Sequence, residues 1–545
     1  MESGAMFGDI ANWIYLGLAA YIVLVIAIGL YFSRGITECD DHVVGGRDIS
    51  FVYLVGSTAA TWLCAGAILG AAGYAYMFGF QGTIYDPWAP ALTLVLSGVF
   101  FVYRMRQAGY TSIVDFYDNR YGRQMSILFM IIQVIGTMSW LAGQMVAAGV
   151  LVQVTTGFSY AVSVVIGTAV IIFITYSGGL KALARLDTMN TVLIIIALAI
   201  LFPAVIRGIG GWEFFVENAR VWDGIPPFAM LPLPDARGFL YYVGLFGLIS
   251  YIAAWLGVGL GDLSCAILMQ RALAARTARI ASGGFIVAGV LYLAIAMIPV
   301  MIGIAVFTYG FRIASPADNE QVLIWATQNF MPDWFAVFFI VVVTGAILST
   351  AGDSTLINST MLGHNVYRYF RPKATTVDTL KAVRVAIPIT ALICMAIAIL
   401  LPSLYKLIVF AGCIGLPTVV PAFVAGLFWK KANLKGAVAS FFAGVAAWII
   451  GFVWALPFTL EANWYMVDFE VWYWVDEGIW DALFFATIPA LVVCVATLII
   501  VSLKTQVSDP AKPMLNAQGE NMEDKPMFFW SKKKEGAPED KDESA

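Results

Sequence analysis

The sequence predicts an all-α protein that crosses a lipid bilayer many times. Of its 545 residues, 61% are hydrophobic and only 12% are charged, and the mean hydropathy is +0.84. A soluble protein of this length carries about twice that share of charged residues. The apolar residues also fall into runs that are long enough to cross a membrane as helices. This composition excludes a soluble globular protein.

The apolar runs divide the chain into a membrane domain and a polar tail. The first run is long enough to span, and residues 1–11 lack the basic start of a cleavable signal peptide. We expect a transmembrane domain over 1–505 and a disordered cytoplasmic tail over 506–545, where the chain becomes polar, proline-containing and finally acidic. The runs predict about 13 transmembrane helices, at 12–32, 51–78, 84–103, 125–155, 160–176, 186–206, 239–269, 280–307, 333–362, 382–401, 404–428, 435–456 and 480–502.

Basic residues are distributed unequally between the two sets of connecting loops. With the N-terminus outside, 26 of the 31 basic residues lie on the opposite side or in the tail. Loops on the cytoplasmic side of a membrane carry an excess of Lys and Arg. The asymmetry predicts an odd number of spans, with the N-terminus outside and the C-terminus in the cytoplasm of a plasma or bacterial inner membrane.

The ninth run is interrupted by the polar segment Ser349–Thr355, in which five of seven side chains carry oxygen. Hydrocarbon cannot satisfy these groups, so they must face other helices, water or an ion. Hydroxyls followed by a carboxylate offer the hard oxygen ligands that a small cation needs. The alternative is a polar face for helix packing, because Ser and Thr commonly join membrane helices.

The second run, 51–78, contains a repeat of small residues at Gly66, Gly70 and Gly73. One interpretation is close helix packing. The other is an unwound segment near Thr61–Gly66, whose freed carbonyls point at an ion. Interrupted helices near the membrane midplane form the binding sites of many secondary transporters. The local sequence supports both interpretations equally.

Five motifs, in order along roughly residues 12–455, make the chain resemble the sodium:solute symporter family. Each motif is weak alone, but their order and their places in the predicted topology agree with the family pattern. They are Gly45-Gly46-Arg47, Asp115-Phe116 with Arg120-Tyr121-Gly122, Tyr176–Ala182 with Asp187, Gln270–Leu273, and Ile347–Thr350 with Asn365-Val366-Tyr367.

The resemblance implies a leucine-transporter-type inverted-repeat fold and a sodium-coupled symporter. It implies no enzymatic activity and no nucleic-acid partner. The implied partners are a small solute, Na⁺ and the lipid bilayer, and a monomer is sufficient for transport. Five neutral oxygen ligands suit a Na⁺ ion that gives up its hydration shell. The family sodium site maps here onto the backbone carbonyls of Ala60, Leu63 and Ala346 and the hydroxyls of Ser349 and Thr350.

Two acids are candidates for a second ion site or for the sodium exit path. Asp187 matches a family aspartate at the start of the sixth run, where pairing with Arg185 is the alternative. Asp353 stands one position after the carboxylate of many relatives, where this chain has Gly352. That shift turns the side chain by about 100° on a helix, so the role of Asp353 does not transfer directly.

Tryptophans suggest the class of solute. Trp62 and Trp140 lie in segments that resemble the high-affinity choline transporter branch, where both rings enclose an ammonium group. Aromatic faces attract quaternary cations. At two other positions where that branch has aromatic rings, this chain has none. Trp88 or Trp255 are candidate substitutes for these rings. We therefore expect a choline- or betaine-like solute. The alternative solute is a neutral amino acid such as proline or a small monocarboxylate. The alternative role of the tryptophans is helix packing, with no contact to the solute.

Few residues support other classes of function. The chain has only two histidines, and its six cysteines show no metal-like spacing. An enzyme would need a nucleophile with its base, a metal cluster or a cofactor lysine. A transporter-like membrane sensor would usually carry a signalling domain, whereas only about 40 polar residues follow the last run. Asp86 and Asp262 are further intramembrane acids of undecided role.

Overall fold

The chain folds almost wholly into helices. The computed structural model describes residues 10–33, 43–222, 224–231, 244–313, 316–402, 404–462 and 471–531. It divides into two compact units. The first unit contains Met1–Pro87, Thr137–Ala229 and Val287–Ile408, and the second contains Trp88–Gly136, Met230–Ile286 and Val409–Ala545.

The helices agree with a polytopic membrane protein. Within the described residues, nine helices are long and apolar enough to cross a membrane, or up to eleven if each of two bent pairs counts as one span. The first and fifth predicted spans correspond to the shorter apolar helices Asn12–Val25 and Tyr160–Tyr176. The count of 13 therefore stays a prediction.

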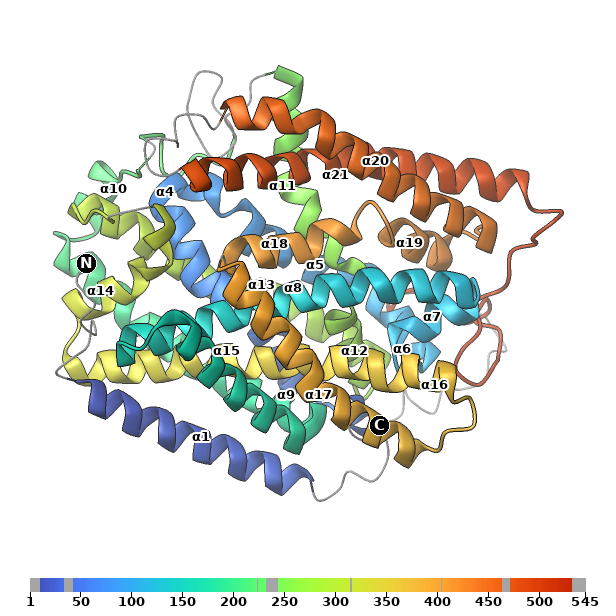
Figure 1. The fold of residues 1–545 in the computed structure, drawn as a ribbon, viewed down its shortest axis with the longest axis horizontal. Coiled ribbons are helices and arrows are strands. Elements are labelled where there is room, and N and C mark those ends of the chain that lie inside the picture. Colours follow the sequence, from blue (N-terminus) through green and yellow to red (C-terminus); the bar gives the residue numbers. More distant parts are fainter. Residues whose placement is uncertain are drawn as a thin grey trace. The chain divides into compact units, whose positions relative to one another are not determined.

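The first unit is organised around α9. This helix packs against its neighbours α1, α3, α15 and α17, and its sequence contains two apolar stretches, Tyr160–Tyr176 and Ala182–Gly208. The helices wholly within the unit are α1 (Ala11–Ser33), α3 (Phe51–Trp62), α4 (Ala71–Gly82), α9 (Tyr160–Gly208), α10 (Trp212–Asn218), α14 (Val322–Phe330), α15 (Asp333–Thr360), α16 (Tyr367–Phe370) and α17 (Thr376–Leu400), seen in Figure 1.

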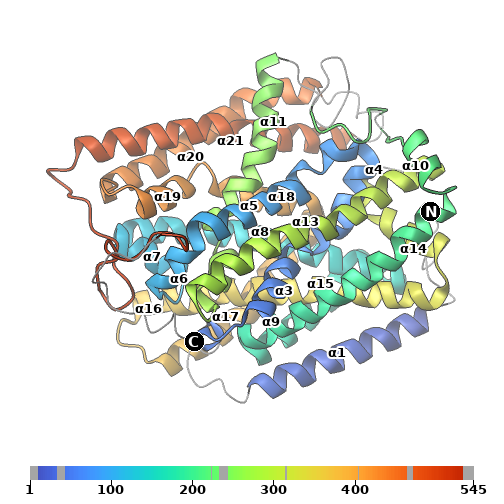
Figure 2. The same ribbon diagram turned by 180° about the vertical axis from the view of Figure 1, so that it is seen from behind.

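The second unit contains α20 and α21, which pack against each other and lie side by side in both views (Figures 1 and 2). Its helices are α5 (Ala89–Leu96), α6 (Val102–Ala108), α7 (Ile113–Arg120), α11 (Gly244–Gly261), α12 (Ala266–Ala274), α19 (Val420–Phe428), α20 (Leu434–Ala462) and α21 (Val471–Lys504). Three helices pass from one unit to the other: α8 (Arg123–Thr156), α13 (Ala278–Tyr309) and α18 (Leu404–Gly415).

Three apolar segments are interrupted rather than continuous. The pair Phe51–Trp62 and Gly66–Gly82 is bent by 58°, and the pair Val409–Gly415 and Val420–Phe428 by 53°. In the third, α11 passes through the short 3₁₀ turn η5 (Asp262–Ser264) into an extended Cys265 before α12 begins. The first bend agrees with the interpretation of an interrupted segment near Thr61–Gly66, one of the two that the local sequence left open. The other two were not predicted.

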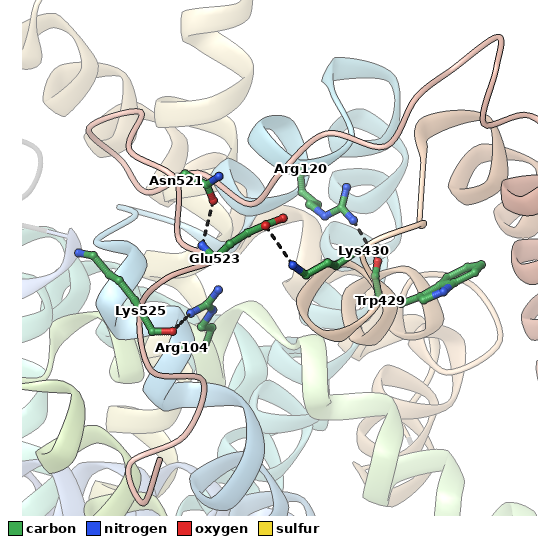
Figure 3. Close-up of polar contacts among 7 residues, drawn as sticks. All are labelled: Arg104, Arg120, Trp429, Lys430, Asn521, Glu523 and Lys525. Carbon is green, nitrogen blue, oxygen red and sulfur yellow. Dashed lines mark hydrogen bonds and ion pairs between the residues drawn. The ribbon is translucent and has the colours of Figure 1, made fainter. Parts of the chain in front are cut away.

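The start of the predicted tail is folded. Residues 506–531, which we call the C-terminal strap, belong to the second unit and make hydrogen bonds to other segments of it, such as the bond from Arg104 to the Lys525 carbonyl in Figure 3. Their composition predicts disorder, and the structure differs because arginine and asparagine side chains of other segments bond to the strap's main chain. Residues 532–545 of the predicted tail lie outside the described part of the chain.

Glycine permits the close approach of α11 and α18 within the second unit. A Cβ atom at Gly261 would lie 2.0 Å from the carbonyl oxygen of Gly412, whereas one at Gly259 would meet only ordinary contacts at 3.4 Å. Neither backbone can yield without moving its helix. The two helices can therefore pack this closely only with glycine at position 261. Gly259, on the same helix, has room for a methyl group and is a matched control position.

We expect Gly261→Ala to lower the thermal unfolding midpoint of the detergent-solubilised protein. The added methyl group overpacks the contact, and overpacking costs about 1–3 kcal/mol. Gly259→Ala is the control and should leave the midpoint nearly unchanged. Equal midpoints for the two variants, measured by scanning fluorimetry, would show that the helices separate at little cost.

Candidate functional site

The break after α3 exposes backbone carbonyls inside the membrane domain. The helix ends at Trp62, Leu63 caps it with a non-helical ψ of 52°, and the next helical residues form the π-turn η2 (Gly66–Gly70). The last carbonyls of a helix have no partner within it. Every residue from Leu54 to Gly73 is buried, so these carbonyls need partners from other helices or from an ion.

Gln144 of α8 stabilises the broken segment. Its side chain is fully buried and reaches the break from the side. The amide oxygen accepts a hydrogen bond from the backbone N–H of Ala65 (3.4 Å), and the amide nitrogen donates to the Cys64 sulfur (3.2 Å). Sequence analysis missed this residue. The available signal was a glutamine in a largely apolar span, four residues after Trp140.

The polar segment of α15 meets this break. The Thr350 hydroxyl donates to the carbonyl oxygen of Ala60 at 3.4 Å, and the Ser349 hydroxyl donates to that of Ala346 at 3.1 Å. Four of the five predicted sodium-ligand residues are therefore linked in pairs. The fifth, Leu63, lies three residues after Ala60 at the end of α3. The donor set consists of neutral oxygens, which suit a Na⁺ ion that gives up its hydration shell.

The remaining hydroxyls of the segment are satisfied within α15 itself. Ser354 donates to the carbonyl of Thr350 and Thr355 donates to that of Ala351, each one turn earlier in the helix. This back-bonding satisfies a buried hydroxyl without a second helix. Of the hydroxyls between 349 and 355, only those of Ser349 and Thr350 bond to a predicted ligand carbonyl.

Asp187 lies against the same helix as Ala60. Its carboxylate is fully buried and accepts a hydrogen bond from the Ser57 hydroxyl at 2.7 Å. Ser57 and Ala60 stand three residues apart on α3 and so share one face. Asp353 is also fully buried, three residues after Thr350 on α15. The guanidinium of Arg185 lies over the Tyr53 ring, 5.0 Å from its centroid.

Asn190 joins three helices beside Ser349. Its amide nitrogen donates to the Ser349 hydroxyl (3.0 Å) and to the carbonyl of Gly345 (3.2 Å), and its oxygen accepts from the Tyr21 hydroxyl (3.1 Å). Tyr21 also donates to the Gly345 carbonyl at 3.1 Å. Sequence analysis missed Asn190, although its place three residues after Asp187 in an apolar span was an available signal.

Trp62 and Trp140 form a buried pair in the first unit. Their ring centroids are 6.1 Å apart and their planes meet at 58°, so the rings form a corner rather than a sandwich. Both side chains are buried, and among the described residues neither indole N–H has a hydrogen-bond partner. The other two predicted rings, Trp88 and Trp255, belong to the second unit and are half-buried.

Two further acids are buried next to breaks in the helices. Asp86 lies within the turn η3 (Ile84–Trp88) before α5 and accepts a hydrogen bond from the Tyr292 hydroxyl. Asp262 stands at the interruption after α11. Its Oδ1 would lie 3.4 Å from a Cβ atom placed at Gly412.

Comparison with known proteins identifies the family. The model of the sodium:solute symporter family matches residues 42–444, well over half of the chain. The chain belongs to the sodium:solute symporter family. It is therefore a membrane transporter of a family that couples solute movement to sodium, and not an enzyme.

Curated relatives agree with the family. The chain is 26% identical over 455 residues to the high affinity choline transporter 1 of Homo sapiens, covering 80% of this chain and 76% of the relative. It is 24% identical over 466 residues to the corresponding protein of Caenorhabditis elegans, covering 80% and 78%. It is also 26% identical over 495 residues to a sodium/proline symporter of Haemophilus influenzae, covering 85% and 92%.

Solved structures confirm the predicted fold class. A Na⁺-coupled sialic acid symporter matches with a TM-score of 0.67 and 18% identity, covering 88% of this chain and 97% of that structure. A nucleobase-cation-symport-1 family transporter matches with a TM-score of 0.52 and 12% identity, covering 88% and 97%. The transporter thus has the leucine-transporter-type fold.

Substitution of Asn190 tests whether this residue organises the hydrogen bonds beside Ser349. Asn190→Leu keeps the volume but removes two donated bonds and one accepted bond, leaving buried groups without partners at about 1–3 kcal/mol each. We expect a larger fall in the thermal unfolding midpoint than for Tyr21→Phe, which removes a single hydroxyl. If Tyr21→Phe has the larger effect, then Asn190 does not organise this contact.

Proposed function

We propose that this transporter imports a small quaternary amine or zwitterion, choline- or betaine-like, together with Na⁺. The observation that carries the sodium part is the pairing of Thr350 with the Ala60 carbonyl across the break in α3. It joins neutral oxygens from two helices at one place. A site made from two helices can change when either helix moves, which is what alternating access requires.

The proposed sodium ligands are the carbonyls of Ala60, Leu63 and Ala346 and the hydroxyls of Ser349 and Thr350. On binding, the ion would replace the two hydroxyl hydrogen bonds, so that the hydroxyl oxygens and the carbonyls all face the cation. Asn190 would hold the Ser349 hydroxyl in place through its donated bond at 3.0 Å.

Asp187 and Asp353 are proposed to form a second ion site or to line the exit path. Both carboxylates are fully buried, and they stand on α9 and α15, which pack together. Ionisable groups inside a membrane domain are costly and commonly mark ion or proton pathways. The Ser57 hydroxyl bond keeps one Asp187 oxygen oriented beside α3.

The proposed class of substrate rests on the arrangement of the Trp62 and Trp140 rings. Two ring faces that meet at 58° can both contact one rounded trimethylammonium group, an attraction worth up to about 2 kcal/mol once the cation is desolvated. The two buried indole N–H groups would suit a ligand that also carries an oxygen acceptor. Choline and betaine have both features. Trp88 and Trp255 are proposed as further substrate contacts.

Orientation and location are part of the proposal. The excess of basic residues on one side supports an external N-terminus and a cytoplasmic C-terminus in the plasma or inner membrane, with the monomer as the functional unit. An inside-negative potential then drives Na⁺ inward by about 2.3 kcal/mol per 100 mV.

A second candidate is a sodium symporter for proline, another neutral amino acid or a small monocarboxylate. The likeness to the sodium/proline symporter, which spans 92% of that relative, favours it specifically. Proteoliposome uptake of labelled choline, betaine, proline and pyruvate, with and without a Na⁺ gradient, separates the candidates. A transporter-like sensor would bind a solute without accumulating it.

Replacing both Ser349 and Thr350 with Ala should abolish the stimulation of uptake by Na⁺. The double change removes the two side-chain oxygens and leaves only carbonyls. The matched control is Ser354→Ala with Thr355→Ala, because those hydroxyls bond only within α15. The measurement is solute uptake as a function of Na⁺ concentration. Wild-type sodium dependence in the Ser349→Ala, Thr350→Ala variant would contradict the proposed sodium site.

Trp62→Ala and Trp140→Ala should each weaken choline binding by up to roughly 30-fold, the equivalent of about 2 kcal/mol. Binding of the uncharged isostere 3,3-dimethyl-1-butanol should weaken less, because only the cation gains from the ring quadrupole. The exposed Trp334, changed to Ala, is the control. Equal losses for both ligands would mean that the rings supply shape alone, and absence of choline binding to the wild type would favour the amino-acid candidate.

A further inference from the structure

The interruption between α11 and α12 places an acid inside the second unit. The helix α11 ends at Gly261, the turn η5 contains Asp262, and Cys265 is extended before α12 begins. The acid lies within the apolar span Gly247–Ser264 and is only 5% exposed. Ionisable groups in such segments are costly and commonly mark an ion or proton pathway. The proposed sodium site and solute contacts leave this acid without a role.

The main chain around this interruption is bonded by neighbouring helices of the same unit. The Ala266 N–H donates to the side-chain oxygen of Gln133 at 2.9 Å, and the Thr93 hydroxyl donates to the Gly259 carbonyl at 2.5 Å. The glutamine belongs to α8 and the threonine to α5. These bonds stabilise the interruption, and neither of them uses the Asp262 carboxylate.

The bend between α18 and α19 is bonded in a similar way. The Thr418 hydroxyl donates to the Ile414 carbonyl at 2.7 Å, and the Tyr117 hydroxyl of α7 donates to the Val419 carbonyl at 3.0 Å. The N–H of Val419 donates to the Gly415 carbonyl, also at 3.0 Å. These carbonyls already accept hydrogen bonds from the protein. A metal ion that used them as ligands would have to displace those bonds.

The Asp262 carboxylate itself has no polar partner among the described residues. The elements packed against α11 or η5 include α5, α12, α19 and α21, while α18 approaches α11 at Gly261 and α8 contacts the interruption through Gln133. The described titratable or charged side chains of these elements within the second unit are Arg123, Tyr251, Cys265, Arg271, Cys413, Asp481, Cys494 and Lys504. None of them donates a hydrogen bond to the carboxylate or forms an ion pair with it.

The space beside the carboxylate is narrow. A Cβ atom at Gly412 of α18 would lie 3.4 Å from Asp262 Oδ1 and 3.0 Å from the Cα atom of Val258. The carboxylate therefore lies against a glycine backbone instead of facing a ring of oxygen atoms. A Na⁺ ion needs several oxygen ligands in place of its hydration shell, whereas a proton needs one carboxylate oxygen and no added space. Among small cations, the geometry fits a proton.

We propose that Asp262 is a proton-binding site and that it releases its proton when α11 and α18 separate. Burial without a partner disfavours the charged carboxylate, so the packed helices keep the group protonated and neutral. Separation of the helices admits water, which solvates the charge and favours release. Proton binding is thereby linked to the packing of these two helices. The proposed sodium ligands belong to the first unit, so this site depends on neither Na⁺ nor the transported solute.

Infrared spectroscopy of the full-length protein in phosphatidylcholine vesicles detects the proposed proton directly. A protonated carboxyl group has a C=O stretch that an ionised carboxylate lacks, and an exposed aspartic acid is ionised at neutral pH. We expect the wild type to show a protonated-carboxyl band at neutral pH that disappears in alkaline buffer and that Asp262→Asn lacks. The control is Asp333→Asn, which removes an exposed acid of α15 and should leave the band unchanged. This measurement needs no transport, so its failure is distinct from failure of the proposed function.

The matched glycine variants test the link to helix packing. Gly261→Ala forces α11 and α18 apart and lets water reach the carboxylate. Its band should therefore disappear about one pH unit lower than in the wild type, which corresponds to about tenfold weaker proton binding. Gly259→Ala should titrate as the wild type does. This comparison keeps the Asp262 carboxyl group and so tests the proposal even if Asp262→Asn does not fold.

Three results would overturn the proposal. Identical spectra of the wild type and Asp262→Asn would mean that Asp262 holds no proton at neutral pH. Equal titration of the two glycine variants would mean that helix packing does not control the proton. Loss of the band on addition of Na⁺ or choline at constant pH would assign the carboxylate to that cation instead.

Discussion

The absence of water inside the bilayer is the constraint on which the rest of this structure depends. A helix that breaks within hydrocarbon leaves backbone N–H and C=O groups that only another helix or an ion can satisfy. At the break after α3, Gln144 accepts a hydrogen bond from the Ala65 N–H, and Thr350 donates one to the Ala60 carbonyl. These contacts stabilise the break, and the Thr350 contact, long at 3.4 Å, is the one that we propose a cation replaces.

The same constraint divides the polar residues of α15 into two groups. Hydroxyls that bond to their own helix, such as Ser354, are satisfied in every conformation in which the helix persists. Hydroxyls that bond across to a broken helix, such as Thr350, depend on where that helix lies. Only the second kind can couple the occupancy of a site to helix movement. Asn190 extends this dependence to α1 through Tyr21.

The sequence predicted those features that local composition determines. A break near Thr61–Gly66 was one of two interpretations of small and polar residues within an apolar run, and the polar segment Ser349–Thr355 was recognised from oxygens that hydrocarbon cannot solvate. The choice of Ser349 and Thr350 as sodium ligands came from the family resemblance and stays a prediction. It did not predict Gln144 or Asn190 because an amide in an apolar helix reveals a need for partners but not their identity. The strap was missed for the opposite reason. Its own residues are typical of disorder, and the groups that fix it, Arg104 and Arg120, lie about 400 residues earlier.

The two arginines also explain why one side of the second unit can be basic and still compact. A buried guanidinium is costly unless its donors are bonded, and Arg120 meets this requirement with three main-chain carbonyls, two from the end of α19 and one from the strap. Arg104 and Arg120 belong to segments whose basic residues supported the predicted orientation, and both also bond to the main chain of the strap. Arg104 lies on α6, and Arg120 on α7 also bonds to the Gly426 carbonyl of α19, so the strap is connected to the ends of three helices.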